Sequence, residues 1–125
     1  MCKIAIACEG ESLDSSVAED FGSAPYFVIV DTGKTEAEVL QNAARWARDG
    51  DAAAARAVVA AGAEAVLASW ILPDAMHVLE AAGIEIHPGI VGRAKDALTM
   101  RWDVLRPPEM ESPLSAAGAM LPRAA

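Results

Sequence analysis

The sequence predicts a single three-layer α/β domain, in which a mixed five-stranded sheet is flanked by helices. Three observations lead to this prediction. Two apolar segments of strand length occur before residue 31, and a turn signal follows the second. From residue 51 onward helical and strand patterns alternate, which is typical of parallel strands joined by crossover helices. The chain has 125 residues, 54% of them hydrophobic, which suffices for one buried core.

The first half of the chain predicts an antiparallel meander. Residues 3–7, KIAIA, have the small and β-branched side chains of a buried strand, and residues 26–30, YFVIV, have high β-propensity. The turn signal at residues 31–34, DTGK, predicts that residues 35–40 return as an antiparallel edge strand. Residues 41–50 have no clear periodicity, so we expect a loop or an irregular turn there.

The second half predicts three helices and two further strands. Asp51 can cap a helix that runs to Ala61 and is stopped by Gly62. Pro73 in a first turn and Gly83 just past the end bracket a second helix. The remaining elements are strands at residues 65–69 and 84–87 and a third helix over residues 93–101. The expected order of elements is therefore β-β-β-α-β-α-β-α.

We expect residues 1–105 to form the domain and residues 106–125 to form an extended or disordered tail. The tail holds four of the seven prolines and has no periodicity. The other interpretation of the tail is a segment that adds to a partner's surface. No apolar run approaches the roughly 18 residues of a membrane span, and no secretory signal pattern is present, so we expect a cytoplasmic protein without a membrane partner.

Charge and cysteine content narrow the class of protein further. The net charge of −8 argues against nucleic acid as a partner, because binding to phosphates depends on lysine and arginine. Cys2 and Cys8 lie on one predicted strand, about 20 Å apart at about 3.3 Å per residue, whereas a disulfide needs about 5.5 Å. We therefore expect free thiols and a reducing compartment.

Polar and aromatic residues follow three of the predicted strands at their carboxyl ends. They are Cys8 and Glu9, Ser69 and Trp70, and His87. In open sheets with parallel strands, ligands collect beyond these ends. We therefore expect a thiol, an indole and an imidazole around one crevice, roofed by the loop at residues 9–24.

Cys8 and His87 are the candidate metal ligands of this crevice. A thiolate suits iron, copper or an iron–sulfur type cluster, and neutral imidazole is a common metal ligand. The alternatives are a small buried hydrophobic residue for Cys8 and a half-buried strand residue for His87. Trp70 either lines a pocket for a flat or apolar ligand or seals the core. His77 lies near Glu80 on one predicted helix, which indicates a solvated face.

Five carboxylates occupy the loop after the first strand, without a base among them. They are Glu9, Glu11, Asp14, Glu19 and Asp20. Hard cations take such oxygen ligands, but the spacing does not match a calcium-binding EF-hand loop, so a solvated acidic loop is favoured. The P-loop, G-x-G-x-x-G, C-x-x-C and G-x-S-x-G patterns are all missing from the sequence, which favours a protein that is not an enzyme.

Two motifs are specific enough to indicate a family. They are the FGSAPYF run at residues 21–27 and AAGI at residues 81–84. With the flanking segments, from Lys3 to about Leu98, the chain resembles the dinitrogenase iron-molybdenum cofactor biosynthesis family, the NifX-type carriers. The resemblance implies a ribonuclease-H-like fold and a non-catalytic carrier or chaperone of an iron–sulfur or iron–molybdenum type cluster, as in nitrogen fixation. It implies metallocofactor assembly proteins as partners and leaves a homodimer open.

The crevice and the resemblance together define the expected cluster-binding residues. They are Cys8, Glu9, Asp20, Phe21, Gly22, Ser69, Trp70 and His87. Cys8 and His87 would ligate the metal, with Asp20 as a weak third ligand. Cluster-binding relatives often carry histidine where Asp20 stands. The alternative function is a metal-free interaction module of the same fold, docking onto a cofactor-assembly enzyme or regulator.

Overall fold

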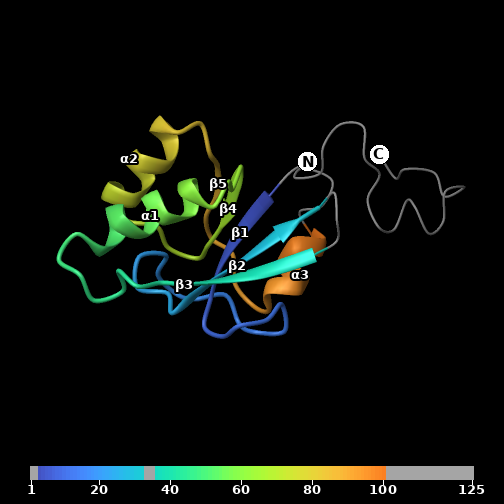
Figure 1. Cartoon of the computed structure of the whole chain (residues 1–125). Helices are drawn as coiled ribbons and strands as arrows, with labels where there is room; N and C mark the ends of the chain where they lie inside the picture. The colour runs from blue at the N-terminus through green and yellow to red at the C-terminus, as the bar shows by residue number, and fades with distance from the viewer. Residues whose placement is uncertain (1–2, 33–35, 101–125) are drawn as a thin grey trace, which may run out of the picture.

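A mixed five-stranded sheet lies between two helical layers in the computed structural model, which describes residues 3–32 and 36–100 (Figure 1). The elements in chain order are β1 (Lys3–Cys8), β2 (Tyr26–Asp31), β3 (Glu36–Gln41), α1 (Gly50–Ala60), β4 (Ala65–Leu67), α2 (Pro73–Ala81), β5 (Glu85–His87) and α3 (Ala94–Met100). The predicted order of elements is confirmed. The expected tail at residues 106–125, the end of the expected domain and Cys2 lie outside the described residues.

The strands are arranged in the order β3-β2-β1-β4-β5, so β1 is the central strand. β1 pairs antiparallel with β2 and parallel with β4, β2 pairs antiparallel with β3, and β4 pairs parallel with β5. α2 connects the parallel strands β4 and β5, as parallel pairing requires a crossover. The carboxyl ends of β1, β4 and β5 therefore lie at the same edge of the sheet.

The two faces of β1 carry side chains of different size. Ala5 and Ala7 lie in one core cluster with Ala54 of α1, whereas Ile4 and Ile6 lie in the cluster on the α3 side. All five side chains are fully buried. Because successive strand residues point to opposite faces, the alanines let α1 pack closely on the sheet while the isoleucines fill the space under α3. Figure 1 shows α1 and α2 on one side of the sheet and α3 on the other.

The ends of α1 and α2 use the same glycine motif. Gly62 and Gly83 have φ angles of 90° and 78°, a left-handed conformation that favours glycine. Their amides donate to the carbonyls of Val59 and Glu80, each at 3.0 Å. The predicted helix stops are confirmed. Within the described residues no helix has the length and apolar character to cross a bilayer.

The start of α1 corrects one prediction. The first helical hydrogen bond runs from the Ala53 amide to the Asp49 carbonyl at 2.9 Å, so Asp49 is the N-cap residue of α1. Asp51, the expected cap, lies inside the first turn. The sequence pattern missed this because a turn over the preceding residues, including a bond from the Gly50 amide to the Ala47 carbonyl, leads directly into the helix.

Ala5→Leu tests the close packing of α1 on β1. We expect the larger side chain to lower the free energy of unfolding by about 1–3 kcal/mol, because the filled core must shift to accept it. Equilibrium unfolding in urea measures this loss. The control is Ala37→Leu on the exposed face of β3, which we expect to change stability by less than about 0.5 kcal/mol. Equal stability of the two variants would contradict the packing described here.

Candidate binding crevice at the carboxyl edge of the sheet

A crevice of about 700 Å³ opens where β1 and β4 end. The described residues that line it are Glu9, Ala18, Glu19, Asp20, Ser23, Arg45, Ser69, Trp70 and Leu72. The loop that follows β1 is tied to the segment after β4 by a backbone bridge between Asp20 and Trp70, in which the Phe21 amide donates to the Trp70 carbonyl at 2.8 Å. This bridge joins segments fifty residues apart in the sequence into one wall.

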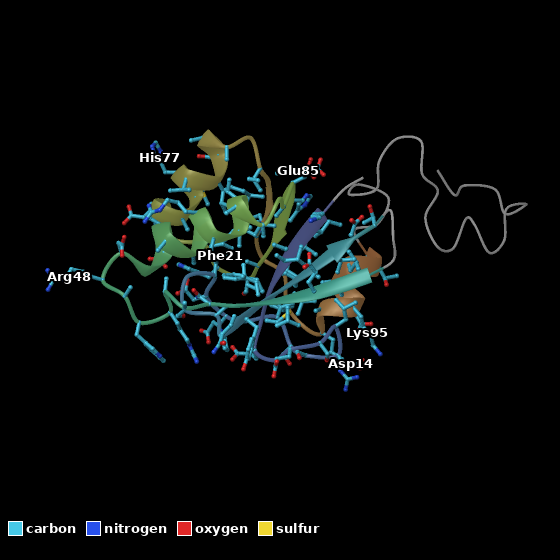
Figure 2. The ribbon with its side chains drawn as sticks, viewed as in Figure 1. Asp14, Phe21, Arg48, His77, Glu85 and Lys95 are labelled. Carbon is cyan, nitrogen blue, oxygen red and sulfur yellow. The ribbon has the colours of Figure 1, made fainter. Side chains whose placement is uncertain are left out.

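The Phe21-Gly22 pair anchors the loop to the body of the domain. Phe21 lies in the interior of the domain (Figure 2) and is fully buried. Its ring centroid is 4.9 Å from that of Phe27. At Gly22 a Cβ atom would lie 1.6 Å from Oδ1 of Asp51, so only glycine leaves room for the first turn of α1. The pair therefore positions the crevice and is not among its lining residues.

Asp20 brings an unsatisfied acceptor to the crevice. Its Oδ2 accepts a hydrogen bond from the Ser23 hydroxyl at 3.0 Å. Its Oδ1 is buried and has no hydrogen-bond partner within the described part of the chain. A buried carboxylate oxygen without a partner is costly, so this atom favours a bound donor or metal ion.

Arg45 is the cation of the crevice lining. Its Nε donates to the Ser23 carbonyl at 2.9 Å, and its guanidinium carbon lies 4.6 Å from the centre of the Trp46 ring system. An arginine has five N–H donors, so the bond from Nε leaves others to serve a ligand. Arg45 is not among the site residues that the sequence predicts. The signal that could have found it is the adjacent tryptophan, a common stacking partner of arginine.

Four of the eight predicted site residues line the crevice, and four do not. Those in the lining are Glu9, Asp20, Ser69 and Trp70, whereas Cys8, Phe21, Gly22 and His87 lie outside it. Cys8 is fully buried in the core cluster on the α3 side of the sheet. Burial raises the pKa of its thiol to about 11, so at neutral pH the thiol is protonated, and the thiolate is the form that binds metals.

The expected meeting of Cys8 and His87 at one crevice is not observed. Their strands are not adjacent, because β4 lies between β1 and β5. Ile6 of β1 pairs with Leu67 of β4, and Leu67 pairs with His87 of β5. Two strand spacings of about 4.8 Å and two residue rises of about 3.3 Å put the two Cα atoms about 12 Å apart. The His87 ring instead contacts the Glu85 carboxylate. In residues 3–32 and 36–100, no three His, Cys, Asp or Glu side chains form a group that could hold a metal ion.

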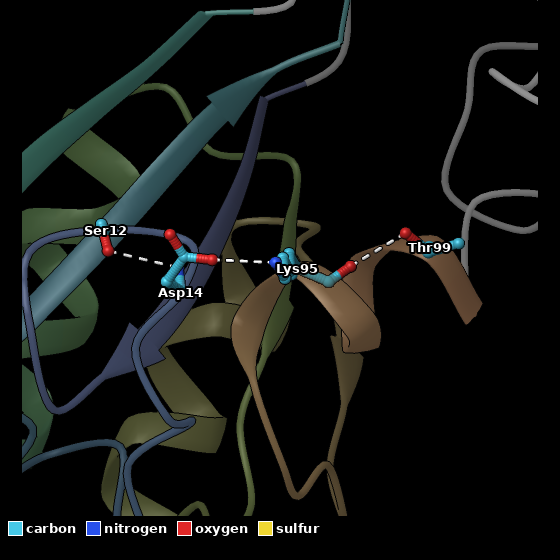
Figure 3. A network of polar contacts seen from close by, with 4 residues as sticks. All are labelled: Ser12, Asp14, Lys95 and Thr99. Atoms are coloured by element: carbon cyan, nitrogen blue, oxygen red, sulfur yellow. Dashed lines mark hydrogen bonds and ion pairs between the residues drawn. The ribbon is translucent and has the colours of Figure 1, made fainter.

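A lysine of α3 forms an ion pair with the acidic loop that follows β1. Lys95 Nζ lies 2.9 Å from Oδ1 of Asp14 (Figure 3), and the hydrogen bond from Lys95 holds the pKa of this carboxyl below its usual value. The amides of Ala94 and Lys95 donate to the carbonyls of Ser15 and Leu13 at 2.9 and 2.8 Å. The loop therefore satisfies the first N–H groups of α3, which a helix start leaves unpaired.

Two other polar side chains lie away from the crevice. His77 is exposed on α2 and points away from the sheet, as the predicted solvated face requires (Figure 2). Arg48 is exposed in the turn before α1 and also points outward (Figure 2). Neither contributes to the crevice lining.

Asp51 carries an electrostatic cost next to the crevice. Burial, together with the negative charges of Asp20 and Asp74, raises the pKa of the Asp51 carboxyl. Asp74 lies in the first turn of α2, so the starts of two helices bring acidic residues close to the crevice wall. Each of these side chains is favourable for its own helix start, but their charges oppose one another.

The chain matches known proteins along most of its length. A family model described as dinitrogenase iron-molybdenum cofactor matches residues 2–102. The apo form of the orange protein from Desulfovibrio gigas is 32% identical, with a TM-score of 0.79 over 86% of this chain and 92% of that chain. A putative NifB protein from Thermotoga, assigned to the DUF35 family, is 29% identical, with a TM-score of 0.72 over 83% and 89%. No curated protein matches the chain.

Asp51→Asn tests the charge repulsion beside the crevice. Because the pKa of Asp51 is raised above its ordinary value of 3.8, the folded state binds more protons than the unfolded state between these two pKa values. The stability of the wild type therefore falls as the pH rises through this window. At pH 7 we expect the variant to melt a few degrees higher than wild type. The advantage should disappear below pH 3.8, where Asp51 is protonated.

Thermal unfolding followed by circular dichroism at several pH values measures this difference. Asp96→Asn, the matching change in the first turn of α3, is the control because it removes the favourable interaction of an acid with a helix start. We expect this control to be equal to or slightly below wild type. A lower melting temperature for Asp51→Asn at pH 7 would contradict the repulsion.

Proposed function

The chain belongs to the dinitrogenase iron-molybdenum cofactor family, and we propose that it is a non-catalytic carrier that holds a metal–sulfur cluster as cargo in the crevice between β1 and β4. The cluster would be of the iron–sulfur or iron–molybdenum type. The observation that carries the proposal is the buried Oδ1 of Asp20, which has no hydrogen-bond partner in residues 3–32 and 36–100, in a crevice that also holds the Arg45 side chain.

The donors and acceptors in the crevice suit a cluster bound loosely. Oδ1 of Asp20, which is buried without a hydrogen-bond partner among the described residues, would ligate one metal atom of the cargo. The Arg45 guanidinium and the Ser69 hydroxyl can donate hydrogen bonds to sulfides, which accept them. A carboxylate is a hard ligand and binds the soft metals of such clusters less firmly than a thiolate does. Weak ligation favours a carrier, because its cargo must be released to the next protein.

Ligation by Cys8 and His87 is the alternative arrangement for the same cargo. It requires the Cys8 thiol to lose its proton inside an apolar core, against the burial that raises its pKa. It also requires the ends of β1 and β5 to approach each other across β4. The described geometry supports the crevice arrangement, and the same experiment tests both.

The partners of a carrier are the proteins that load and unload it. We propose that metallocofactor assembly proteins fill these roles, as the family description suggests. The open position of the crevice at the edge of the sheet suits such an exchange, because Glu9, Glu19 and Trp70 of its lining are all exposed.

Asp20→Asn should abolish cargo binding. The protein is purified without oxygen and incubated with ferrous iron and sulfide, or with extracted iron–molybdenum cofactor. Visible absorbance and elemental analysis after gel filtration then measure the bound cluster. We expect the wild type to gain a chromophore and Asp20→Asn, which keeps the shape of the side chain, to bind at least about tenfold less, the loss expected when about 1.4 kcal/mol of binding is removed.

Cys8→Ala and His87→Gln separate the two ligand sets. In the crevice arrangement both variants keep the chromophore, and Asp96→Asn serves as a surface carboxylate control. Loss of the chromophore in Cys8→Ala, with Asp20→Asn unchanged, would establish the thiol and imidazole as ligands instead. A wild type that stays colourless and free of metal with both sources would end the carrier proposal.

A further inference from the structure

Three large apolar side chains stand exposed around the mouth of the crevice. The exposed fractions are 81% for Trp46, 63% for Trp70 and 37% for Leu72. Trp70 and Leu72 line the crevice directly, and Trp46 stacks with Arg45, which also lines it. We call Trp46, Trp70 and Leu72 the tryptophan rim.

The tryptophan rim has the composition of a protein-docking surface. Tryptophan and arginine are enriched at the energetic centre of protein interfaces, whereas highly exposed tryptophans are unusual on a surface that faces only water. Arg45 is held in a fixed position by its bond to the Ser23 carbonyl and by the Trp46 ring. An arginine held in this way loses little side-chain freedom on binding.

The charges around the rim select the kind of partner. Glu9 and Glu19 are exposed beside it, and Asp20 lies deeper in the crevice, half-buried. These three carboxylates outnumber the one guanidinium of Arg45 in the lining. A positively charged surface is therefore attracted to the mouth, whereas phosphates of nucleic acid or anionic lipids are repelled.

We propose that the tryptophan rim, with Glu9 and Glu19, is the docking surface for a basic segment of a partner protein. An aliphatic side chain of the partner packs against Trp70 and Leu72, and an arginine or lysine pairs with Glu9 or Glu19 or stacks on the indole. The inference goes beyond the carrier role and does not depend on it, because the cargo would be held by Asp20 inside the crevice while the partner contacts the rim.

A two-dimensional NMR titration of the full chain, labelled with ¹⁵N, tests the proposal. The probe is a synthetic peptide of three Leu-Arg repeats, and its counterpart has three Leu-Glu repeats. We expect the indole N–H signals of Trp46 and Trp70 to shift and saturate with the basic peptide at a Kd of about 100 µM, and to stay unchanged with the acidic one. Raising the salt concentration should weaken binding, because exposed charges are screened.

Variants assign the binding to the rim. We expect Trp70→Ala, and the pair Glu9→Gln with Glu19→Gln, each to weaken binding of the basic peptide about tenfold or more. Because all three sites are exposed, the amide spectrum should confirm that these variants fold. Val91→Ala is the control: Val91 is 77% exposed, lines a different cavity and should leave binding unchanged. Asp20→Asn removes a half-buried charge deeper in the crevice and should weaken peptide binding by less than the Glu9 and Glu19 pair does, which separates this result from the cargo experiment.

Three outcomes would overturn the proposal. The first is no shift of either indole signal by the basic peptide at millimolar concentration. The second is equal binding of the two peptides, or shifts centred on Val91 and Met100, which would indicate non-specific apolar contact. The third is a dimer of the chain in sedimentation that Trp70→Ala dissociates, because the occupant of the rim would then be a second copy.

Discussion

The domain depends on the burial of β1 on both faces and both edges. Its residues from Ile4 to Cys8 are completely shielded from water, and its backbone pairs with β2 on one side and β4 on the other. Every layer is positioned from this strand: the helices of one face lie against its alanines, and α3 lies over its isoleucines. A strand enclosed in this way has no room for charged side chains. Polar chemistry is therefore displaced to its carboxyl end, where the chain turns into the acidic loop.

Local patterns were sufficient to predict most of the fold. Short-range sequence preferences predict the strand segments and the glycines that end α1 and α2, and the structure confirms both. They also predict the edge of the sheet at which polar residues gather. The order of strands does not follow from them. Because β4 lies between β1 and β5, Cys8 and His87 end at the same edge without being neighbours. Similarly, no local signal shows that Lys95 reaches back to Asp14, or that Gly22 leaves room for Asp51.

The crevice combines interactions that oppose one another. Among the described residues, Asp20 has a buried oxygen without a hydrogen-bond partner, burial and the charge of Asp20 raise the pKa of Asp51, and two tryptophans are exposed to water. Each of these features is unfavourable for an isolated domain. They lie around a wall held by the Phe21 anchor and the bridge to Trp70. Within the part of the chain that the structure describes, no other buried side-chain nitrogen or oxygen lacks a hydrogen-bond partner. The locally unfavourable features of the domain thus lie at the proposed binding site, where natural proteins commonly place them.

The capping of α3 by the acidic loop connects the two sides of the sheet. A helix of seven residues is too short to be stable alone, and the first amides of α3 depend on the carbonyls of Leu13 and Ser15. The same loop continues through Glu19 and Asp20 into the crevice wall. We therefore expect the loop and the helix to unfold together as one cooperative unit. A ligand in the crevice would then slow amide hydrogen exchange in α3, although the helix does not line the crevice and only the loop connects the two.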